Sequence, residues 1–213
     1  MDNNSKIIIN VGRQIGSGGR IVAQLLAERF KCRFYDREIL NIAAKESGFS
    51  MEYFEQNDEH KNFFKSIFHS STSYPSQNTF YNSEFSQDNL FRIQSEAIKK
   101  AAEKESCVFV GRCADYVLRD FPNVINIFIT ADLNDRIDAV SERRGCTPDE
   151  ARKIITNGEA QRQKYYNYYT GKRWGHAESY DLCFNSSLLG IGTTAEMIGQ
   201  IIGGWIVNKG ISK

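Results

Sequence analysis

A glycine-rich stretch near the start of the chain has the composition of an anion-binding loop. It reads Gly16-Ser17-Gly18-Gly19 and is flanked by two arginines, Arg13 and Arg20. Glycines let the backbone turn tightly and direct several N–H groups to one point, and the N-terminus of a following helix adds a partial positive charge. Guanidinium groups bind phosphate oxygens in a fork. The pattern favours a phosphate cradle, and a plain tight turn is the alternative.

A second candidate site follows another apolar segment of the chain. Gly111 and Arg112 come directly after Ser106–Val110, and Asp115 lies three residues beyond Arg112. Ligands of open α/β sheets bind outside the carboxyl ends of the strands. This placement favours a phosphate contact for Arg112 over a surface ion pair.

Further arginines lie where two consecutive helices are expected. Arg136, Arg143 and Arg144 share the first of these helices, and Arg162 lies in the second. Negative charge builds up on a phosphoryl group during its transfer, and positioned arginines can neutralise it. The alternative is a solvated helix face with ion pairs along the helix, which is the commoner role of such charges.

Aromatic residues precede a short basic segment after the same helix. Four tyrosines cluster within 165–169, and Lys172 and Arg173 follow them. Aromatic rings beside cations can stack on nucleobases, and they can equally pack a helix onto the core, which is the commoner outcome.

The elements that position these residues alternate between strands and helices, which predicts a parallel sheet covered on both faces. Lys6–Val11 is expected to be the central strand, flanked by the third and fourth strands, because phosphate-binding loops follow strands at the crevice of such sheets. The expected strands are Lys6–Val11, Cys32–Asp36, Ser106–Val110, Val124–Thr130 and Tyr180–Phe184. The expected helices are the segment after Gly19 to Phe30, then Arg37–Ser47, Asp88–Lys104, Asp132–Arg144, Pro148–Tyr169 and Thr194–Asn208.

The stretch Ser50–Gln87 interrupts this alternation. It holds nine Phe and Tyr residues among Ser, Asn and Gln, which is too aromatic for a disordered linker. We interpret it as an insertion, about residues 50–87, that is helical to about His69 and covers a sheet edge or a ligand. The length of 213 residues then predicts a single domain, 1–213, with this insertion.

The composition excludes several classes of function. The formal net charge is +1, which argues against a general nucleic-acid binder or a polybasic membrane binder. No apolar run approaches the roughly 20 residues that span a bilayer, and the polar start is unlike a secretion signal, so we expect a cytoplasmic protein. The five cysteines form no CxxC pair and the three histidines have no metal-ligand spacing, so neither disulfides nor a metal site is expected.

The chain resembles the cytidylate-kinase-like branch of the P-loop nucleoside monophosphate kinases. The segments that carry the resemblance are Arg13–Arg20, Phe34–Glu38, Val110–Asp115 and Tyr165–Lys172. The resemblance implies an α/β, three-layer P-loop NTPase fold with a five-stranded parallel sheet, helices on both faces, and a helical lid at about residues 143–172. It also implies ATP and Mg²⁺ as cofactors and a small-molecule nucleotide as substrate.

The resemblance also implies roles for individual residues. Arg13, Arg162 and Arg144 would be catalytic, the latter two by closing over the transferred group. Asp36 would lie at the acceptor site or cap the next helix, two compatible roles. The residues implied for the donor phosphates are Gly16, Ser17, Gly18, Gly19, Arg20 and Ile21, and those implied for the acceptor are Asp36, Arg37, Arg112 and Asp115.

The glycine loop departs from the usual pattern G-x-x-x-x-G-K-[ST]. Arg13 occupies the position of the first glycine, Gly19 that of the lysine, and Ile21 that of the hydroxyl residue that ligates Mg²⁺. Arg13 and Arg20 are the candidates to replace the charge of the lysine, and Ser17 or a water is the candidate to replace the hydroxyl. Two hypotheses therefore stand: an ATP-dependent kinase of a nucleoside monophosphate such as CMP or a similar small acceptor, and a catalytically inactive module that binds a nucleotide or anion. The sequence leaves the oligomeric state open.

Overall fold

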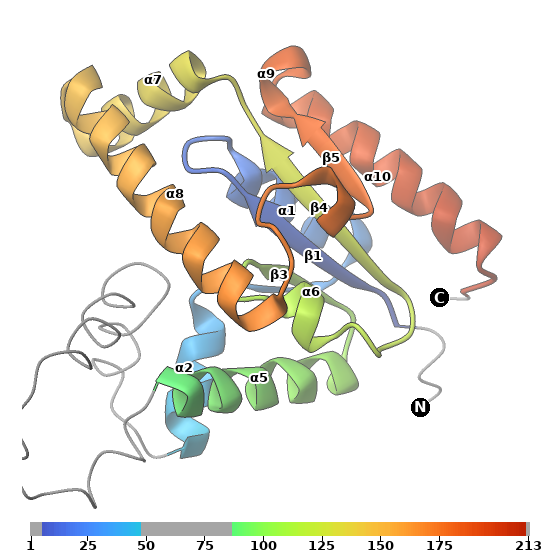
Figure 1. Ribbon diagram of the computed structural model, residues 1–213. Helices are drawn as coiled ribbons and strands as arrows, with labels where there is room; N and C mark the ends of the chain where they lie inside the picture. The colour runs from blue at the N-terminus through green and yellow to red at the C-terminus, as the bar shows by residue number, and fades with distance from the viewer. Residues whose placement is uncertain (1–5, 48–86, 212–213) are drawn as a thin grey trace, which may run out of the picture.

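A parallel sheet forms the centre of the molecule (Figure 1). The computed structural model describes residues 6–47 and 87–211. The order of the strands across the sheet is β2-β3-β1-β4-β5, and every neighbouring pair is parallel. The strands are β1 (Ile8–Arg13), β2 (Arg33–Tyr35), β3 (Cys107–Val110), β4 (Val124–Thr130) and β5 (Leu182–Asn185).

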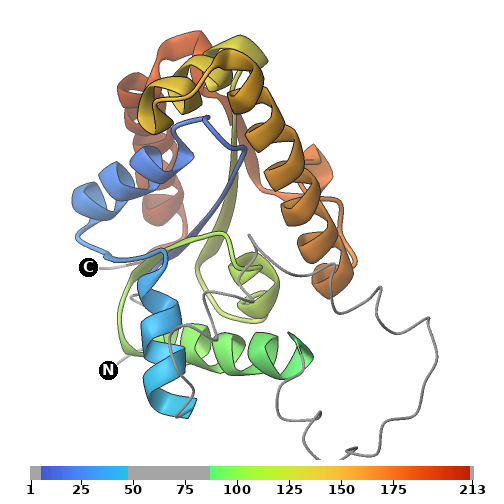
Figure 2. The same ribbon diagram turned by 90° about the vertical axis from the view of Figure 1, so that its left-hand side faces the viewer.

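The described helices cover both faces of this sheet, as Figures 1 and 2 show. One 3₁₀ turn, Ala177–Ser179, precedes β5. The helices are α1 (Gly19–Phe30), α2 (Glu38–Ser47), α5 (Gln87–Lys104), α6 (Ala114–Val117), α7 (Leu133–Arg144), α8 (Pro148–Thr170), α9 (Ser186–Leu189) and α10 (Ile191–Asn208).

The alternation of side chains along β1 explains the two cores. Ile9 and Val11 are fully buried against α1 and α10, which contribute residues such as Leu26 and Ile198. Ile8 faces the other way and packs with residues of α2 and α5. Successive side chains of a strand point to opposite faces, so a strand buried on both sides needs an almost continuous apolar run.

The structure confirms the predicted fold class and sheet. The first strand is central and is flanked by the third and fourth strands, as the glycine loop after it suggested. Where element ends differ from the predicted ones, they differ by one to three residues, as at β5, which runs from Leu182 to Asn185. The predicted insertion lies outside the described residues except for Gln87, which starts α5.

The long helix α8 lies beside the sheet, along the side where the carboxyl ends of β1 and β3 open (Figure 2). Its N-terminus is fixed by a capping box in which Thr147 and Glu150 satisfy each other's backbone N–H groups, with Pro148 in the first turn. The predicted lid therefore corresponds to one helix of 23 residues together with the turn before it. Among the described helices none is long and apolar enough to cross a membrane.

Candidate functional site

The glycine loop between β1 and α1 depends on its glycines for shape. Gly16 and Gly18 have φ of +85° and +70°, a region that side-chain-bearing residues rarely adopt. A Cβ on Gly16 would lie 2.6 Å from the backbone oxygen of Arg136 in α7. The Ser17 side chain is buried, and its hydroxyl donates to the backbone oxygen of Gln14 at 3.0 Å. The Ser17 hydroxyl therefore stabilises the loop itself.

Arg13 packs against Gly19, the residue that holds the position of the usual P-loop lysine. A Cβ on Gly19 would lie 2.5 Å from the Cβ of Arg13, so a side chain at residue 19 has no room in this conformation. Arg13 is also part of the lining of a pocket beside the loop. The side chain of Arg13, at the end of β1, thus occupies the space that a side chain at residue 19 would need.

The pocket opens to solvent at the carboxyl ends of β1 and β3. Three arginines from three different parts of the chain line it: Arg13 at the end of β1, Arg112 after β3 and Arg162 in α8. The other residues of the lining are Asn10, Val11, Gly12, Gly111, Cys113, Asp115, Tyr165, Tyr166, Trp174 and Tyr180. A pocket with three guanidinium groups is suited to an anion.

Arg112 is a buried cation held on an unusual backbone. Its side chain and backbone are only 4% exposed, and both Arg112 and Cys113 have positive φ, 64° and 53°. Such conformations cost energy in residues other than glycine and cluster at binding sites. Burial lowers the pKa of Arg112 to about 10, and the charges of Arg13 and Arg37 act in the same direction. The guanidinium is still charged at neutral pH, so this end of the pocket presents desolvated positive charge.

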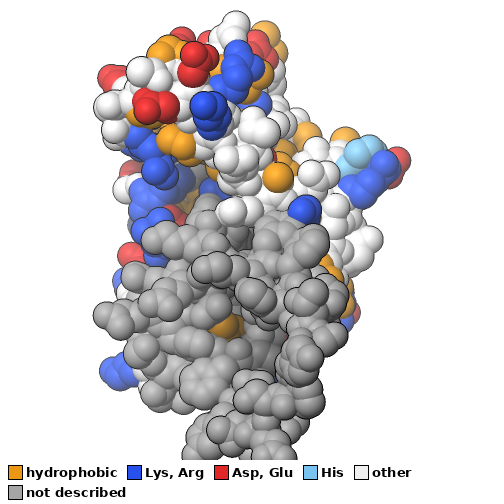
Figure 3. Space-filling view, turned by 60° about the vertical axis from the view of Figure 1, so that its left-hand side comes forward, with side chains coloured by type: hydrophobic (Ala, Val, Ile, Leu, Met, Phe, Trp, Pro, Cys, Tyr) orange, Lys and Arg blue, Asp and Glu red, His pale blue; other side chains and the backbone are white. Residues whose placement is uncertain are grey.

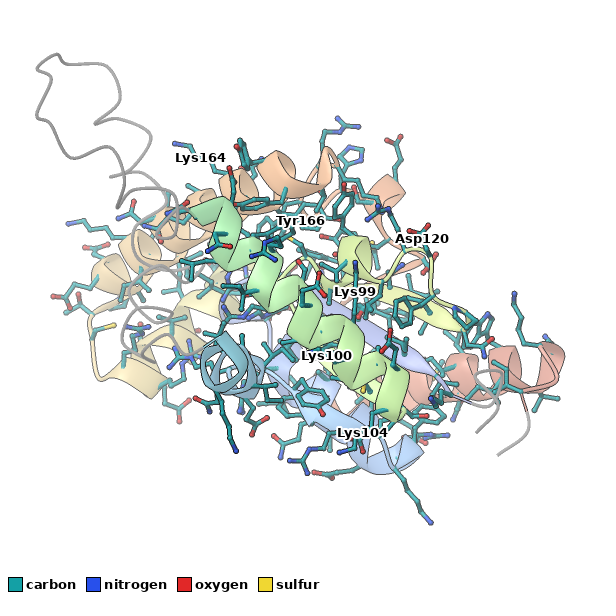
Figure 4. All side chains as sticks on the ribbon, turned by 90° about the horizontal axis from the view of Figure 1, so that it is seen from below. Lys99, Lys100, Lys104, Asp120, Lys164 and Tyr166 are labelled. Carbon is teal, nitrogen blue, oxygen red and sulfur yellow. The ribbon has the colours of Figure 1, made fainter. Side chains whose placement is uncertain are left out.

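Aromatic rings and one carboxylate form another part of the pocket. The Tyr166 hydroxyl donates to Oδ2 of Asp115 at 2.6 Å, and Lys172 Nζ lies 4.0 Å from the same oxygen. Burial raises the pKa of Asp115, while the hydrogen bond from Tyr166 and the charge of Lys172 oppose that rise. In Figure 4, Tyr166 points inward from α8 whereas Lys164 of the same helix points outward.

Helix α8 holds the glycine loop through a carboxylate. Oε1 of Glu159 accepts a hydrogen bond from the Ile15 backbone N–H at 3.0 Å and pairs with Nη1 of Arg136 at 2.7 Å. The Arg136 and Glu159 side chains are 8% and 18% exposed. One turn further along, Nη1 of Arg162 donates to the backbone oxygen of Arg13 at 3.1 Å. These contacts connect α7, α8 and the loop.

Several predicted site residues lie outside the pocket lining. Arg20 is 60% exposed in its side chain, and its Nε lies 2.8 Å from Oδ2 of Asp36. Arg37 is exposed but close enough to lower the pKa of Arg112. Ile21 is 50% exposed on α1.

Arg144 lies in the exposed last turn of α7 and does not line the pocket. Figure 3 shows acidic and basic side chains intermixed over the end of the molecule where α7 and α8 meet. Arg144 is therefore part of a charged surface, whereas Arg162 is part of the pocket.

Asn10, in the middle of β1, is a lining residue that sequence reasoning missed. The signal was present, because Asn10 is a polar residue inside the apolar run Ile7–Val11 of a strand buried on both faces. Trp174 and Tyr180 were not predicted either, since only the path of the chain after α8 brings them over Phe128, to ring distances of 5.2 Å and 4.8 Å.

The residues of the loop do not fit a protein-bound Mg²⁺. Ile21 has no oxygen, and the Ser17 hydroxyl donates within the loop. In the described part of the chain no group of three or more His, Cys, Asp or Glu residues could hold a metal ion. Mg²⁺ bound by the phosphates of a nucleotide and by water needs none of these ligands. All five cysteines are free thiols in the structure.

Residues 8–188 match the model of the cytidylate kinase-like family. The chain belongs to this family. No curated protein matches it. Among solved structures, this family member is similar to an uncharacterised protein from Eubacterium ventriosum ATCC 27560, with 30% identity, a TM-score of 0.71, and coverage of 93% of this chain and 99% of that chain.

Two solved kinases share the fold of this cytidylate kinase-like chain. Shikimate kinase from Bacteroides thetaiotaomicron is 11% identical with a TM-score of 0.53, covering 92% of this chain and 98% of that chain. A gluconokinase from Sinorhizobium meliloti 1021 is 12% identical with a TM-score of 0.52, covering 96% and 95%. At these identities the likeness concerns the P-loop kinase fold alone.

Proposed function

We propose that this protein is a phosphotransferase that moves the γ-phosphoryl group of ATP to a small phosphorylated acceptor, a nucleoside monophosphate such as CMP. The observation that carries the proposal is the pocket beside the glycine loop, into which Arg13, Arg112 and Arg162 converge from three elements. Membership in the cytidylate kinase-like family and the P-loop kinase fold support the same reaction class.

The residues divide between donor and acceptor. Backbone N–H groups of the glycine loop and the Arg13 guanidinium hold the donor phosphates, because the loop has no lysine. Arg112 binds the acceptor phosphate. Arg162 donates to the backbone oxygen of Arg13 and lines the same pocket. It therefore lies between the residues for the donor phosphates and the residue for the acceptor phosphate.

The chemistry needs positioning and charge neutralisation and no covalent intermediate. An oxygen of the acceptor phosphate forms a bond to the γ-phosphorus, and the bond from that phosphorus to the β,γ-bridging oxygen breaks. ADP leaves with the electron pair of the broken bond. The arginines stabilise the negative charge that is spread over the transferred oxygens. Mg²⁺ would be held by oxygens of the ATP phosphates and by water, and there it would neutralise part of the phosphate charge.

The test measures ADP release with ATP, Mg²⁺ and the four common ribonucleoside 5′-monophosphates, one at a time, alongside shikimate and gluconate as acceptors without phosphate. We expect turnover with at least one monophosphate and loss of more than about 100-fold in Arg112→Ala. The matched control is Arg92→Ala, which removes an exposed arginine that bonds Asn89 on α5. Transfer to shikimate or gluconate, without transfer to any monophosphate, would overturn the proposal that the acceptor is a nucleoside monophosphate.

The second hypothesis, a module that binds a nucleotide without transferring phosphate, is an outcome of the same experiment. Binding of ATP and a monophosphate by calorimetry without any ADP release would favour it. This hypothesis is motivated by Gly19 and Ile21, which stand where the usual loop has its lysine and its Mg²⁺-binding hydroxyl residue.

A further inference from the structure

Asn10 is a polar residue at a place where the fold calls for an apolar one. Its neighbours Ile9 and Val11 are fully buried in the core with α1 and α10. Alternation along β1 directs the Asn10 side chain to the opposite face of the sheet. That face carries the pocket, and Asn10 is part of its lining although it is only 4% exposed.

The hydrogen bonds of the Asn10 amide are incomplete within the described part of the chain. Its Nδ2 donates to Oδ1 of Asn126 on the neighbouring strand β4 at 2.9 Å. Its own Oδ1 is buried and accepts no hydrogen bond from a described residue. A buried acceptor without a donor destabilises a fold, and asparagine is unfavourable inside strands. A ligand that supplies the missing donor accounts for both features.

The rest of the pocket is consistent with such a ligand. Asp115 adds a second oxygen acceptor, which already receives a hydrogen bond from Tyr166. The Tyr166 and Tyr180 rings lie roughly parallel, with centroids 6.1 Å apart, and provide apolar walls. The arginines of the pocket are cationic hydrogen-bond donors, which suit a phosphate. The pocket therefore combines a cationic part with a part that is aromatic and rich in acceptors.

We propose that Asn10 determines specificity by accepting a hydrogen bond from an amino or hydroxyl group on the non-phosphate part of the acceptor. The ligand class is a phosphorylated ring compound that carries such a donor. This inference rests on the proposed function for the phosphate end of the ligand, and it assigns to Asn10 a role that is separate from phosphate binding.

The test compares binding by calorimetry of the four ribonucleoside 5′-monophosphates and of inorganic phosphate to the full chain. Asn10→Leu removes the amide at similar size. We expect it to weaken the tightest-binding monophosphate about fivefold or more, and to leave the affinity for inorganic phosphate unchanged. Asn10→Asp keeps an acceptor oxygen and should retain more of the affinity than Asn10→Leu.

The matched control is Asn126→Leu, which breaks the same side-chain hydrogen bond but removes an amide that does not line the pocket. It should leave monophosphate affinity within about twofold. Thermal melting verifies that each variant is folded, and Asn10→Ala replaces Asn10→Leu if the larger side chain prevents folding.

Two results overturn the inference while leaving the proposed function intact. One is equal monophosphate affinity in the wild type and in the folded Asn10→Leu or Asn10→Ala variant. The other is an equal loss in Asn126→Leu, which would make the Asn10–Asn126 pair structural. Failure of the proposed function is recognised separately, because it abolishes ADP release in the wild type.

Discussion

Arg13 is the residue on which we propose that phosphate binding by this loop depends. It lies against Gly19 and lines the pocket, whereas Arg20 is exposed and pairs with Asp36. We expect Arg13→Ala to weaken sulfate or ADP binding about tenfold or more, the effect of losing a charge-assisted hydrogen bond of roughly 1.5–3 kcal/mol. Arg20→Ala is the control and should change the affinity less than threefold. Isothermal calorimetry on both variants decides, and equal effects would contradict the role of Arg13.

A substitution at Gly19 tests the close contact between Gly19 and Arg13. Because an added Cβ would lie 2.5 Å from Arg13 Cβ and 3.2 Å from Ile129 Cβ, Gly19→Ala should destabilise the protein by roughly 1–3 kcal/mol. Gly203 in α10 is the matched control, since its added Cβ meets nothing within 4 Å. Gly203→Ala should stabilise by roughly 0.5–1 kcal/mol. Urea unfolding of the two variants measures both, and a stable Gly19→Ala would refute the close contact.

Asp115 predicts a pH dependence of stability. Burial raises its folded-state pKa above the ordinary value of 3.8, so the folded protein holds the proton of this carboxyl more tightly than the unfolded chain does. The stability that protonation provides is present below 3.8 and is lost as the pH rises through the raised pKa. Asp115→Asn should therefore gain stability relative to the wild type as the pH rises from about 4 to about 7.

Thermal melting across this pH range measures the gain from Asp115→Asn. Asp120→Asn is the control, because the Asp120 side chain is 86% exposed and points outward in Figure 4. A difference from the wild type that is independent of pH, or that falls as pH rises, would contradict the burial of the Asp115 charge.

At the scale of elements, α8 and the glycine loop act as one unit. The Glu159 carboxylate joins Arg136 of α7 to the Ile15 backbone N–H. Glu159→Ala would leave the buried Arg136 charge uncompensated, at a cost of roughly 3–5 kcal/mol. It should also speed the hydrogen exchange of the Ile15 amide, which loses its acceptor. Exchange measured by NMR would contradict the account if the Ile15 amide were unchanged.

The lid that the sequence predicted at about residues 143–172 is in contact with the loop in this structure through Glu159 and Arg162. A lid must open for substrates to exchange, so its mobility stays a prediction. We expect α8 amides in Glu159→Ala to exchange faster than those of β1, and ATP to reduce the difference. Uniform exchange of α8 and the sheet with and without ATP would argue against a lid.

Elements were predictable where the local pattern is strong. β4 was predicted with its observed ends, because Val124–Thr130 is a long run of β-branched and apolar residues. The short helices α6 and α9 have four residues each and no helical periodicity to detect, so they were missed. The site was predictable where residues follow strands, as for Arg112. It was not predictable where the fold brings distant rings together, as for Trp174.

At the scale of the whole molecule, the order of the strands explains where the site forms. β1 lies between β3 and β4, so the loops after β1 and β3 are neighbours and bring Arg13 and Arg112 to one pocket. The central place of the first strand between the third and fourth strands followed from treating the glycine loop as a phosphate-binding loop at the sheet's crevice. Net charge is nearly zero overall, so the positive character belongs to the pocket rather than to the surface as a whole.

The most direct test of phosphoryl transfer at this pocket is ³¹P NMR of ATP, Mg²⁺ and CMP mixed with the wild-type chain and with Arg162→Lys. The account predicts that resonances of ADP and of a new diphosphate product appear together with the wild type. It predicts that they appear at least about tenfold more slowly with Arg162→Lys, because lysine cannot bond Arg13 and the transferred group in the same fork. An unchanged ATP spectrum with the wild-type chain, for CMP and then for the other monophosphates, would contradict the account.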